Sequence, residues 1–511
     1  MFRHKMIMDY LKEDQSVSKS IIDQLDYVFN PSSVAVIGAS NRVGTWGFGV
    51  MTRLLSNSRR EIYPVNPNSS EILGIKAYKN IGEIEKTVDF AVMAVPPEKT
   101  PSVMQECVDK GVKAALVISG GLSESGEEGA MIEDLLVDLA RKGGIRFIGP
   151  NSMGHIDTSS HFSTLAWMEE VKPGPVAFLA QSGTYGQRVV RTGMQGGIGF
   201  SKFVSNGNEA DLHLEDYIEY LAQDDDTKII TAYVEGIREG RRFYELAKTI
   251  TKEKPIIIMK AGGTENSAKA ARSHTSALSG SDLIHDVMFK QAGVIQVEDE
   301  DELFDVVLAL LSVSLPKGEN VGLLTEGGGI GVVAAEVCDK MGLHLPSYST
   351  TTIETMRKLL PPRCSLGNPT DMTDVITAGK AVTFPCLWAI MEDPKIDAVM
   401  LLGGVGATAY FSALMGTDLM HKIPESDQER FKLMIDFLET EELKNLDITR
   451  EKIKEMQKPL FFVNLIPRAV SEPESFNLLR ERNIPIYSNP YRAAKVIKHL
   501  AWYYKYLNRY K

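Results

Sequence analysis

Cysteine is scarce in this chain. The four cysteines among 511 residues are Cys107, Cys338, Cys364 and Cys386. They lie far apart and form no Cys-x-x-Cys pair, so neither a disulfide framework nor a cysteine-based metal site is predicted. Few, widely separated thiols are typical of a reducing compartment, and we expect a cytoplasmic protein without a bound structural metal.

Long hydrophobic runs are also missing. The longest apolar stretches, such as residues 398–402, fall well short of the roughly 18 residues needed to span a bilayer. Residues 1–14 are interrupted by charges and contain no apolar core of the kind found in a signal peptide. We therefore expect no membrane span and no secretory leader.

Basic blocks are absent as well. Asp and Glu outnumber Lys and Arg by 67 to 56, which gives a net charge of −11. Phosphate backbones and anionic membranes attract clustered positive charge. Nucleic acid and membrane surfaces are therefore not expected as partners.

What the chain does contain is an alternation of short apolar runs with helical stretches. A chain of this length is expected to form roughly three domains of 100 to 200 residues. Near-continuous apolar strands between helices predict parallel sheets covered on both faces, an α/β fold. The expected strands are residues 33–37, 61–65, 90–95, 114–118, 145–148, 175–179, 199–204, 229–234, 255–259, 321–325, 398–402 and 459–463.

Turn-forming and charged segments divide these strands into blocks. We predict a helical extension at residues 1–30, a Rossmann-like domain at 31–165, a second α/β domain at 166–315 and a third at 316–511. Residues 158–174 and 312–320 are expected to be linkers. The strongly charged residues 416–458 are expected to form a surface helical insertion in the third domain.

In the first block, small and turn-forming residues follow several of the strands. Ligands of open parallel sheets bind at these carboxyl ends, and glycines let backbone amides approach a phosphate. The spacing is not Gly-x-Gly-x-x-Gly and no acid ends the second strand, which argues against NAD. Ordinary βα turns remain the alternative. The candidate residues for a long phosphate-bearing ligand are Gly38, Ala39, Ser40, Val95, Pro96, Pro97, Ser119, Gly120, Asn151 and Ser152.

The second block carries two similar turns. Hydroxyls and free amides at a helix start favour an anion site, although residues of this kind are more commonly N-caps. The candidates for phosphate binding are Gln181, Ser182, Gly183, Thr184, Asn206 and Gly207. In the third block, residues 325–331 and 402–407 repeat the pattern. They predict a second helix start near the same phosphoryl group, or only close packing of glycines.

His274 lies in a loop of small and hydroxylated residues, 270–282, that follows the strand expected at 255–259. An imidazole surrounded by backbone amides is suited to carry a phosphoryl group. Glu235, at the end of another strand, is positioned to accept the Nδ1–H of this histidine and leave Nε2 as nucleophile. The alternatives are a turn-capping histidine and an exposed acid beside Arg238.

In this order along the chain, the motifs resemble those of the α subunit of ADP-forming acyl-CoA synthetases, relatives of succinyl-CoA synthetase. The resemblance covers about residues 30–415. Its most specific parts are residues 34–40, 148–151, 181–183, 233–236, 273–275 and 280–282.

This resemblance implies a Rossmann-like CoA-binding domain followed by two flavodoxin-like CoA-ligase domains. It implies that acyl-CoA and phosphate give acyl phosphate and CoA, that His274 takes the phosphoryl group with Glu235 steadying it, and that ADP becomes ATP. Ser276, Ser279 and Ser152 depart from the usual family residues, so acetate is not assumed as the acid.

The three α/β blocks leave no stretch of about 200 residues that could form an ATP-grasp domain. A separate β subunit is therefore expected to hold most of the ATP or ADP site and its Mg²⁺, in an α2β2 assembly. Two rivals remain, a regulatory CoA-binding protein on the same scaffold and an NAD(P)-dependent oxidoreductase.

Overall fold

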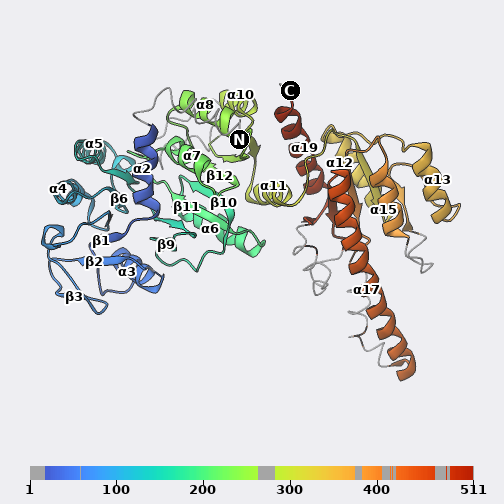
Figure 1. Ribbon diagram of the computed structural model, residues 1–511, viewed down its shortest axis with the longest axis horizontal. Coiled ribbons are helices and arrows are strands. Elements are labelled where there is room, and N and C mark those ends of the chain that lie inside the picture. Colours follow the sequence, from blue (N-terminus) through green and yellow to red (C-terminus); the bar gives the residue numbers. More distant parts are fainter. Residues whose placement is uncertain are drawn as a thin grey trace. The chain divides into compact units, whose positions relative to one another are not determined.

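The computed structural model describes residues 18–57, 59–262, 282–373, 382–405, 415, 417, 422–465, 479 and 484–509. The chain forms two compact units that divide between Glu300 and Asp301 (Figure 1). We call them unit 1 and unit 2 and describe each by itself. Among the described residues, no helix is both long and apolar enough to cross a membrane.

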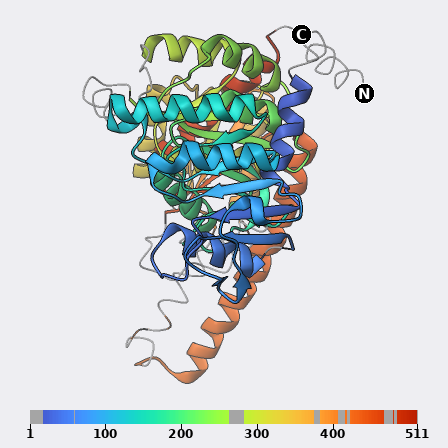
Figure 2. The ribbon, with the colours of Figure 1, turned by 90° about the vertical axis from the view of Figure 1, so that its left-hand side faces the viewer.

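Unit 1 begins with a five-stranded parallel sheet in the order β2-β1-β5-β6-β7. Its strands are β1 (Ser33–Ile37), β2 (Glu61–Val65), β5 (Phe90–Met93), β6 (Ala114–Val117) and β7 (Arg146–Ile148). The first sheet and its helices face the viewer in Figure 2. Almost every strand residue is buried, which is why the strands are apolar along their whole length. The predicted parallel sheet is confirmed.

Helices cover both faces of this first sheet. One face packs against α2 (Ser18–Phe29) and α3 (Trp46–Asn57), and the other against α4 (Thr100–Lys110) and α5 (Glu127–Lys142). Small elements complete the connections: β3 (Glu71–Ile72), β4 (Ile75–Lys76), η1 (Ile81–Glu83), η2 (Pro97–Lys99) and η3 (Ser123–Ser125).

The second sheet of unit 1 has seven strands in the order β14-β13-β12-β10-β11-β8-β9. They are β8 (His155–Asp157), β9 (Phe162–Ser163), β10 (Pro173–Ala180), β11 (Phe200–Ser205), β12 (Ile229–Val234), β13 (Ile256–Lys260) and β14 (Ile295–Val297). Helices α7 (Leu214–Gln223), α8 (Gly240–Ile250) and α10 (Asp282–Ala292) cover one face, and α6 (Gly183–Gln195) packs on the other. The core under α7 is continuous with the core under α2.

The segment that joins the two sheets differs from the prediction. Strands β8 and β9 fall within the expected first domain, 31–165, but β8 pairs antiparallel with β11 of the second sheet. Phe162 and Leu165 are buried. The prediction of a simple linker at 158–174 is therefore wrong, because this segment covers an edge strand that would otherwise be exposed.

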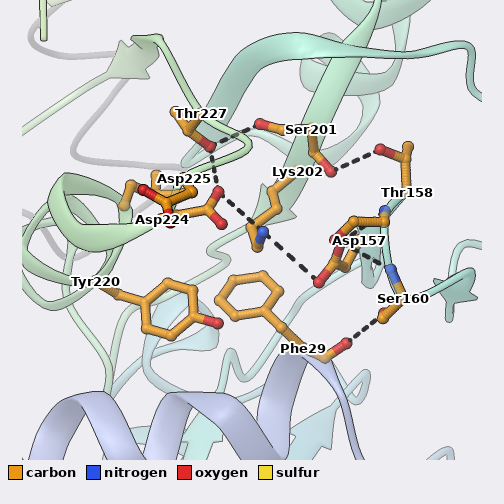
Figure 3. Close-up of polar contacts among 12 residues, drawn as sticks. Phe29, Asp157, Thr158, Ser160, Ser201, Lys202, Tyr220, Asp224, Asp225 and Thr227 are labelled. Carbon is orange, nitrogen blue, oxygen red and sulfur yellow. Dashed lines mark hydrogen bonds and ion pairs between the residues drawn. The ribbon is translucent and has the colours of Figure 1, made fainter.

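The end of helix α2 packs against a buried ion pair formed by other elements (Figure 3). The Lys202 side chain on β11 is 2% exposed, and its Nζ lies 2.9 Å from Asp224 Oδ2 and 3.6 Å from Asp157 Oδ2. The same Nζ lies 5.7 Å from the ring centroid of Phe29 at the end of α2, and Phe29 stacks on Tyr220 of α7. Removing one member of such a group leaves a charge buried without its partner. The described part of the helix expected at residues 1–30 is α2, which contributes to the unit 1 core from Ile21 onward.

Unit 2 contains a third parallel sheet in the order β16-β15-β17-β18-β19. Its strands are β15 (Val321–Thr325), β16 (Thr370–Asp371), β17 (Ala398–Leu402), β18 (Leu460–Val463) and β19 (Ile486–Tyr487). The helices associated with it are α12 (Gly328–Lys340), α13 (Thr350–Leu359), α15 (Thr383–Glu392), α17 (Glu425–Met456) and α19 (Pro490–Leu507).

The helix α11 (Glu300–Ser312) was expected to close the second domain. From Asp301 onward, this helix clusters with unit 2. The Asp305 carboxylate accepts two hydrogen bonds from Arg492 of α19, at 2.6 and 2.8 Å, and Glu302 pairs with Lys495 of the same helix. These ion pairs explain why α11 joins α19.

The predicted helical insertion, 416–458, is seen as α17. This helix has 32 residues and begins directly after Pro424, whose ring fixes the entry to the helix. Its buried residues are confined to one side, where Thr449 Oγ1 accepts a hydrogen bond of 2.9 Å from Trp388 Nε1. The rest of its surface carries many charges, as the sequence indicated, but it also exposes Leu433, Met434, Phe437 and Ile448.

His155 generates a prediction about pH. Its ring is fully buried, with Nε2 2.8 Å from Val28 O and Nδ1 3.0 Å from Thr164 Oγ1. A carbonyl only accepts, so Nε2 carries the hydrogen and the threonine hydroxyl donates to Nδ1. Burial lowers the pKa of His155 from 6.5 to about 4. The unfolded chain therefore binds a proton that the folded chain excludes, and stability falls as the pH falls through this window.

We expect His155→Gln, which cannot take up this proton, to be less stable than the parent at about pH 7. The difference should shrink by about 2 kcal/mol at about pH 4.5. Urea unfolding at both values measures it, and His161→Asn at an exposed position is the matched control. A difference that does not change with pH would contradict the assignment.

Candidate functional site

All three sheets share one feature that selects their ligand-binding edge. Among the parallel strands of each sheet, the first has the second on one side and the third on the other, which is the order 2-1-3-4-5 of flavodoxin-like folds. Such sheets bind ligands at the carboxyl ends of the strands, where the order reverses. The reversal points are β1/β5, β10/β12 and β15/β17.

At β1/β5, the turn from β1 into α3 is closed by glycines. Gly38 has φ +89°, and a Cβ there would lie 2.2 Å from Ala94 O. A Cβ on Gly47, in the first turn of α3, would lie 1.9 Å from Gly38 O. Only glycine permits this approach of helix and strand. Ala39 is buried and Ser40 is half-buried, followed by the exposed residues 41–44. The turn therefore presents the start of α3 to solvent.

The other predicted loops of the first sheet converge on the same edge. The Ser119 hydroxyl donates a 2.6 Å hydrogen bond to Val95 O, and Asn151 N donates to Ser119 O at 2.9 Å. A Cβ on Gly120 would lie 3.0 Å from Asn151 Oδ1. Pro96 is exposed next to Val95. The residues after β5, β6 and β7 are thus brought together, as the sequence predicted.

Ser152 is different from its neighbours. It is 1% exposed, its hydroxyl donates to Ser205 O at 2.6 Å, and its oxygen accepts from Gly154 N at 3.1 Å. The structure uses this hydroxyl to join the first sheet to β11. The prediction that Ser152 contacts a ligand is therefore corrected to a structural role, because both hydrogen-bonding functions of its side chain are satisfied within the chain.

At β10/β12, the start of α6 has the features of an anion site. Ser182 is the N-cap residue, yet its side chain makes no capping hydrogen bond, and Thr184 is exposed. A Cβ on Gly183 would lie 2.5 Å from Met153 Cγ, so a larger residue here would require the Met153 side chain to shift. The first amides of α6 and two hydroxyls are available at one helix start.

Three other phosphate-binding candidates act inside the scaffold instead. Gln181 and Asn206 are buried and their side-chain amides bind other parts of the chain. A Cβ on Gly207, which has φ +63°, would lie 2.1 Å from Pro150 O. The sequence placed these residues at the correct sheet edge. Tertiary contacts decide that they support the loops rather than face solvent.

Glu235 follows β12 and is 7% exposed. Its backbone N donates a 2.6 Å hydrogen bond to Gln181 Oε1, and its backbone O accepts a 3.0 Å bond from Lys260 Nζ. The Tyr233 hydroxyl donates to Glu235 Oε1 at 3.4 Å. Burial and then the Glu235 charge raise the pKa of Tyr233 well above its usual range. The alternative of an exposed acid beside Arg238 is wrong, because this carboxylate is enclosed.

His274 lies outside the described residues. Its segment begins after β13 and ends at α10, which starts at Asp282. Strand β13 pairs with β12, so that Lys260 lies opposite Val234, and Ala261 N donates to Val234 O at 2.9 Å. The chain therefore enters the His274 segment directly beside Glu235.

In unit 2, the corresponding turns meet at β15/β17. Glu326 N donates to Leu402 O at 3.1 Å, and burial raises the pKa of the Glu326 carboxyl. Gly403 and Gly404 both have φ near +80° and place their Cα atoms against this carboxylate. The helix α12 starts immediately after Gly327. A helix therefore starts after this turn, and the neighbouring glycines pack closely against Glu326.

Sequence reasoning missed two functional candidates between the sheets. Asn208 Nδ2 donates to Glu124 Oε2 at 2.6 Å and Glu133 Oε2 at 2.9 Å, which ties the loop after β11 to the first sheet's helices. Glu209 is 2% exposed with φ +51°. The signal for Glu209 in the sequence was an acidic residue that follows Gly207 and Asn208 directly after a strand. In the described part of the chain, no group of three His, Cys, Asp or Glu side chains is arranged to hold a metal.

Comparisons with known proteins agree with this architecture. Residues 32–157 match the family model of a CoA-binding domain, and residues 173–310 match that of a succinyl-CoA ligase-like flavodoxin domain. The α subunit of ADP-forming acetate–CoA ligase II from Pyrococcus furiosus is 41% identical over 74% of this chain and 82% of its own. The α subunit of ligase I from the same organism is 36% identical over 95% of this chain and 99% of its own.

A solved structure extends this likeness to the fold. It is the dinucleotide forming acetyl-coenzyme A synthetase 1 of Ca. Korarchaeum cryptofilum in complex with phosphate and ADP. It is 30% identical, has a TM-score of 0.77, and the match covers 95% of this chain and 98% of that one.

The first turn provides a stability test with a built-in control. Gly38→Ala adds a methyl that meets the Ala94 carbonyl, whereas Gly44→Ala, at φ +85°, has nothing within 4 Å. We expect a loss of about 3 kcal/mol for the first and about 1 kcal/mol for the second, which carries only the backbone strain. Hydrogen exchange of peptides covering β1 and β5 measures both. Equal losses of stability in the two variants would show that close packing against Ala94 is not the reason for glycine at position 38.

Proposed function

Because this chain belongs to the family of ADP-forming acetate–CoA ligase α subunits, we propose that it catalyses the reversible conversion of an acyl-CoA, phosphate and ADP into a carboxylic acid, CoA and ATP. The observation that carries the proposal is the position of Glu235. Its enclosed carboxylate lies at the end of β12, beside the strand that leads into the His274 segment.

The first sheet is the proposed CoA site. The candidates are the turn at Gly38–Ser40, the loop at Val95–Pro97 and the cluster of Ser119, Gly120 and Asn151, which share one edge. The close approach that Gly38 permits brings the start of α3 to this edge, where helix amides favour phosphate. Half-buried apolar atoms of Val95 and Pro97 provide contacts for an uncharged part of the cofactor.

The start of α6 is the proposed phosphate site. An oxygen of phosphate attacks the thioester carbonyl, the C–S bond breaks, and CoA leaves as thiol after taking a proton. The acyl phosphate that results is bound by the amides after Ser182 and by the hydroxyls of Ser182 and Thr184. These donors stabilise the charge that develops on the oxygens.

His274 then takes the phosphoryl group. Its Nε2 attacks phosphorus, the bond to the acyl oxygen breaks, and the carboxylate leaves. Glu235 accepts the hydrogen bond from Nδ1–H, which fixes the tautomer and stabilises the positive ring. A β-phosphate oxygen of ADP finally attacks the same phosphorus, which yields ATP and the free imidazole.

The nucleotide and Mg²⁺ are proposed to bind mainly on a partner β subunit with an ATP-grasp fold, in a cytoplasmic α2β2 complex. Support comes from the three α/β sheets that account for the described residues, and from relatives named as α subunits. Mg²⁺ neutralises charge on the transferring phosphates. A regulatory CoA-binding protein has no use for a buried carboxylate at this position, and the relatives described above are ligases.

The first test is chemical labelling of His274. The chain, its β subunit, an acyl-CoA and radiolabelled phosphate should give a label that is lost in acid and retained in base. His274→Asn should abolish it, because asparagine has no nucleophilic ring nitrogen, while His161→Asn at an exposed site should keep it. A panel of short-chain, branched and aryl acyl-CoAs identifies the acid. Full labelling of the His274 variant would refute the proposal.

The second test concerns Glu235. Glu235→Gln keeps the shape but lacks the charge that stabilises the imidazolium, so kcat for ATP formation should fall about 10²- to 10⁴-fold. Tyr233→Phe, which removes one 3.4 Å hydrogen bond to the same carboxylate, is the milder comparison. An unchanged kcat for Glu235→Gln, measured in rapid-quench turnover, would remove the carboxylate from the mechanism.

A further inference from the structure

We propose that Glu209 is a positioning residue that holds the Gln181 side-chain amide in one orientation and, through it, fixes the backbone of Glu235. The inference rests on the proposed function, in which Glu235 orients His274. It adds a residue that lies one contact further from the reacting atoms.

The contacts of Gln181 carry the first step. Its Oε1 accepts hydrogen bonds from Glu235 N at 2.6 Å and Gly236 N at 3.0 Å, and its Nε2 donates to Gly236 O at 2.8 Å. One side-chain amide therefore satisfies three backbone groups at the end of β12. Buried backbone groups need such partners, so rotation of the amide by 180° would leave two N–H groups facing an NH₂.

Glu209 holds the amide in the same orientation from its other side. Its Oε2 accepts the second hydrogen of Gln181 Nε2 at 2.9 Å, and its Oε1 accepts from Asn206 Nδ2 at 2.5 Å. Asn206 Oδ1 is buried and has no hydrogen-bond partner in the part of the chain that the structure describes. The orientation of Asn206 is thus also set by Glu209. An ionised carboxylate, which only accepts, matches two NH₂ donors.

The backbone conformation of Glu209 is unusual for this residue type. Its φ of +51° lies in the left-handed region, which is uncommon for glutamate. Gly207, two residues earlier, has φ +63°. The turn therefore adopts a costly conformation that directs the Glu209 side chain to Gln181 after β10 and Asn206 after β11.

Ionisation of Glu209 is finely balanced. Burial raises the pKa of its carboxyl to about 7, and the negative charge of Glu215 on α7 adds to this, whereas Asn206, Arg238 and Gln181 oppose it. Tyr217 of α7 also faces this charge. A protonated Glu209 carries a hydrogen on one oxygen and accepts less well from two amides. The arrangement is therefore complete only above about pH 7.

The experiment uses Glu209→Gln in the full α–β complex, with ATP formation from the acyl-CoA identified by labelling. The amide introduced by this substitution presents an NH₂ to one of two NH₂ groups, so we expect kcat to fall about 10- to 100-fold while KM for acyl-CoA changes little. We also expect the parent to show an acid limb of the kcat–pH profile near pH 7, and this limb should disappear in Glu209→Gln. Glu219→Gln is the matched control, since Glu219 is a buried acid of the same unit that pairs with Arg242.

A second variant tests the direction of the hydrogen bonds. In the double variant Asn206→Asp with Glu209→Gln, the new carboxylate accepts from the new NH₂ group, and the new amide oxygen accepts from Gln181 Nε2. We expect this double substitution to recover most of the lost kcat. A merely structural Glu209 predicts the opposite, namely no recovery and equal effects from Glu219→Gln, and either result would overturn the inference.

Failure of the inference can be told from failure of the proposed function. If the parent chain takes up label at His274 and Glu209→Gln does so at the same rate and with the same pH profile, only the positioning role is lost. If the parent chain is not labelled, the proposed function itself fails.

Discussion

The side-chain amide of Gln181 is the contact on which the candidate site of the second sheet depends. The end of β12 is buried, and its backbone groups have no water to bind. Gln181 supplies an acceptor to Glu235 N and Gly236 N and a donor to Gly236 O. Without these bonds, each group would carry a desolvation cost of about 1–3 kcal/mol. A carboxylate held in this way can face a ligand without moving.

The same constraint links the two sheets of unit 1. Loops at the carboxyl ends of parallel strands must satisfy their polar groups in a small volume, and they do so by hydrogen bonds to neighbouring loops. Asn208 joins the loop after β11 to Glu124 and Glu133 of the first domain, and Ser152 joins the first sheet to Ser205. The loops proposed to bind ligands in one sheet are therefore connected to those in the next, which suits the proposed transfer of a group between them.

Glycine allows helices to begin close against the ends of strands at a few positions. Gly38 and Gly47 allow α3 to begin against the end of β1, and Gly183 lets α6 begin against Met153. At Gly38 and Gly47 a methyl group would meet backbone carbonyl atoms, whereas at Gly183 it would displace the Met153 side chain. The helix starts, which carry a partial positive charge, are thereby held at the sheet edge rather than displaced from it.

Much of this protein was determined by its sequence alone. Apolar strands followed by turns predicted the parallel sheets, and the residues after each strand, from Gly38 to Glu235, were placed at the correct edge because parallel strands all end there. Tertiary structure decided the roles within that edge. Ser152, Gln181 and Asn206 have the same chemistry as ligand-binding residues, yet each side chain is used by neighbouring loops. The junction at β8 and β9, the attachment of α11 to α19 and the buried Glu209 were decided in the same way. These features depend on contacts between residues distant in sequence, and local patterns of polarity do not encode which distant group a polar atom will meet.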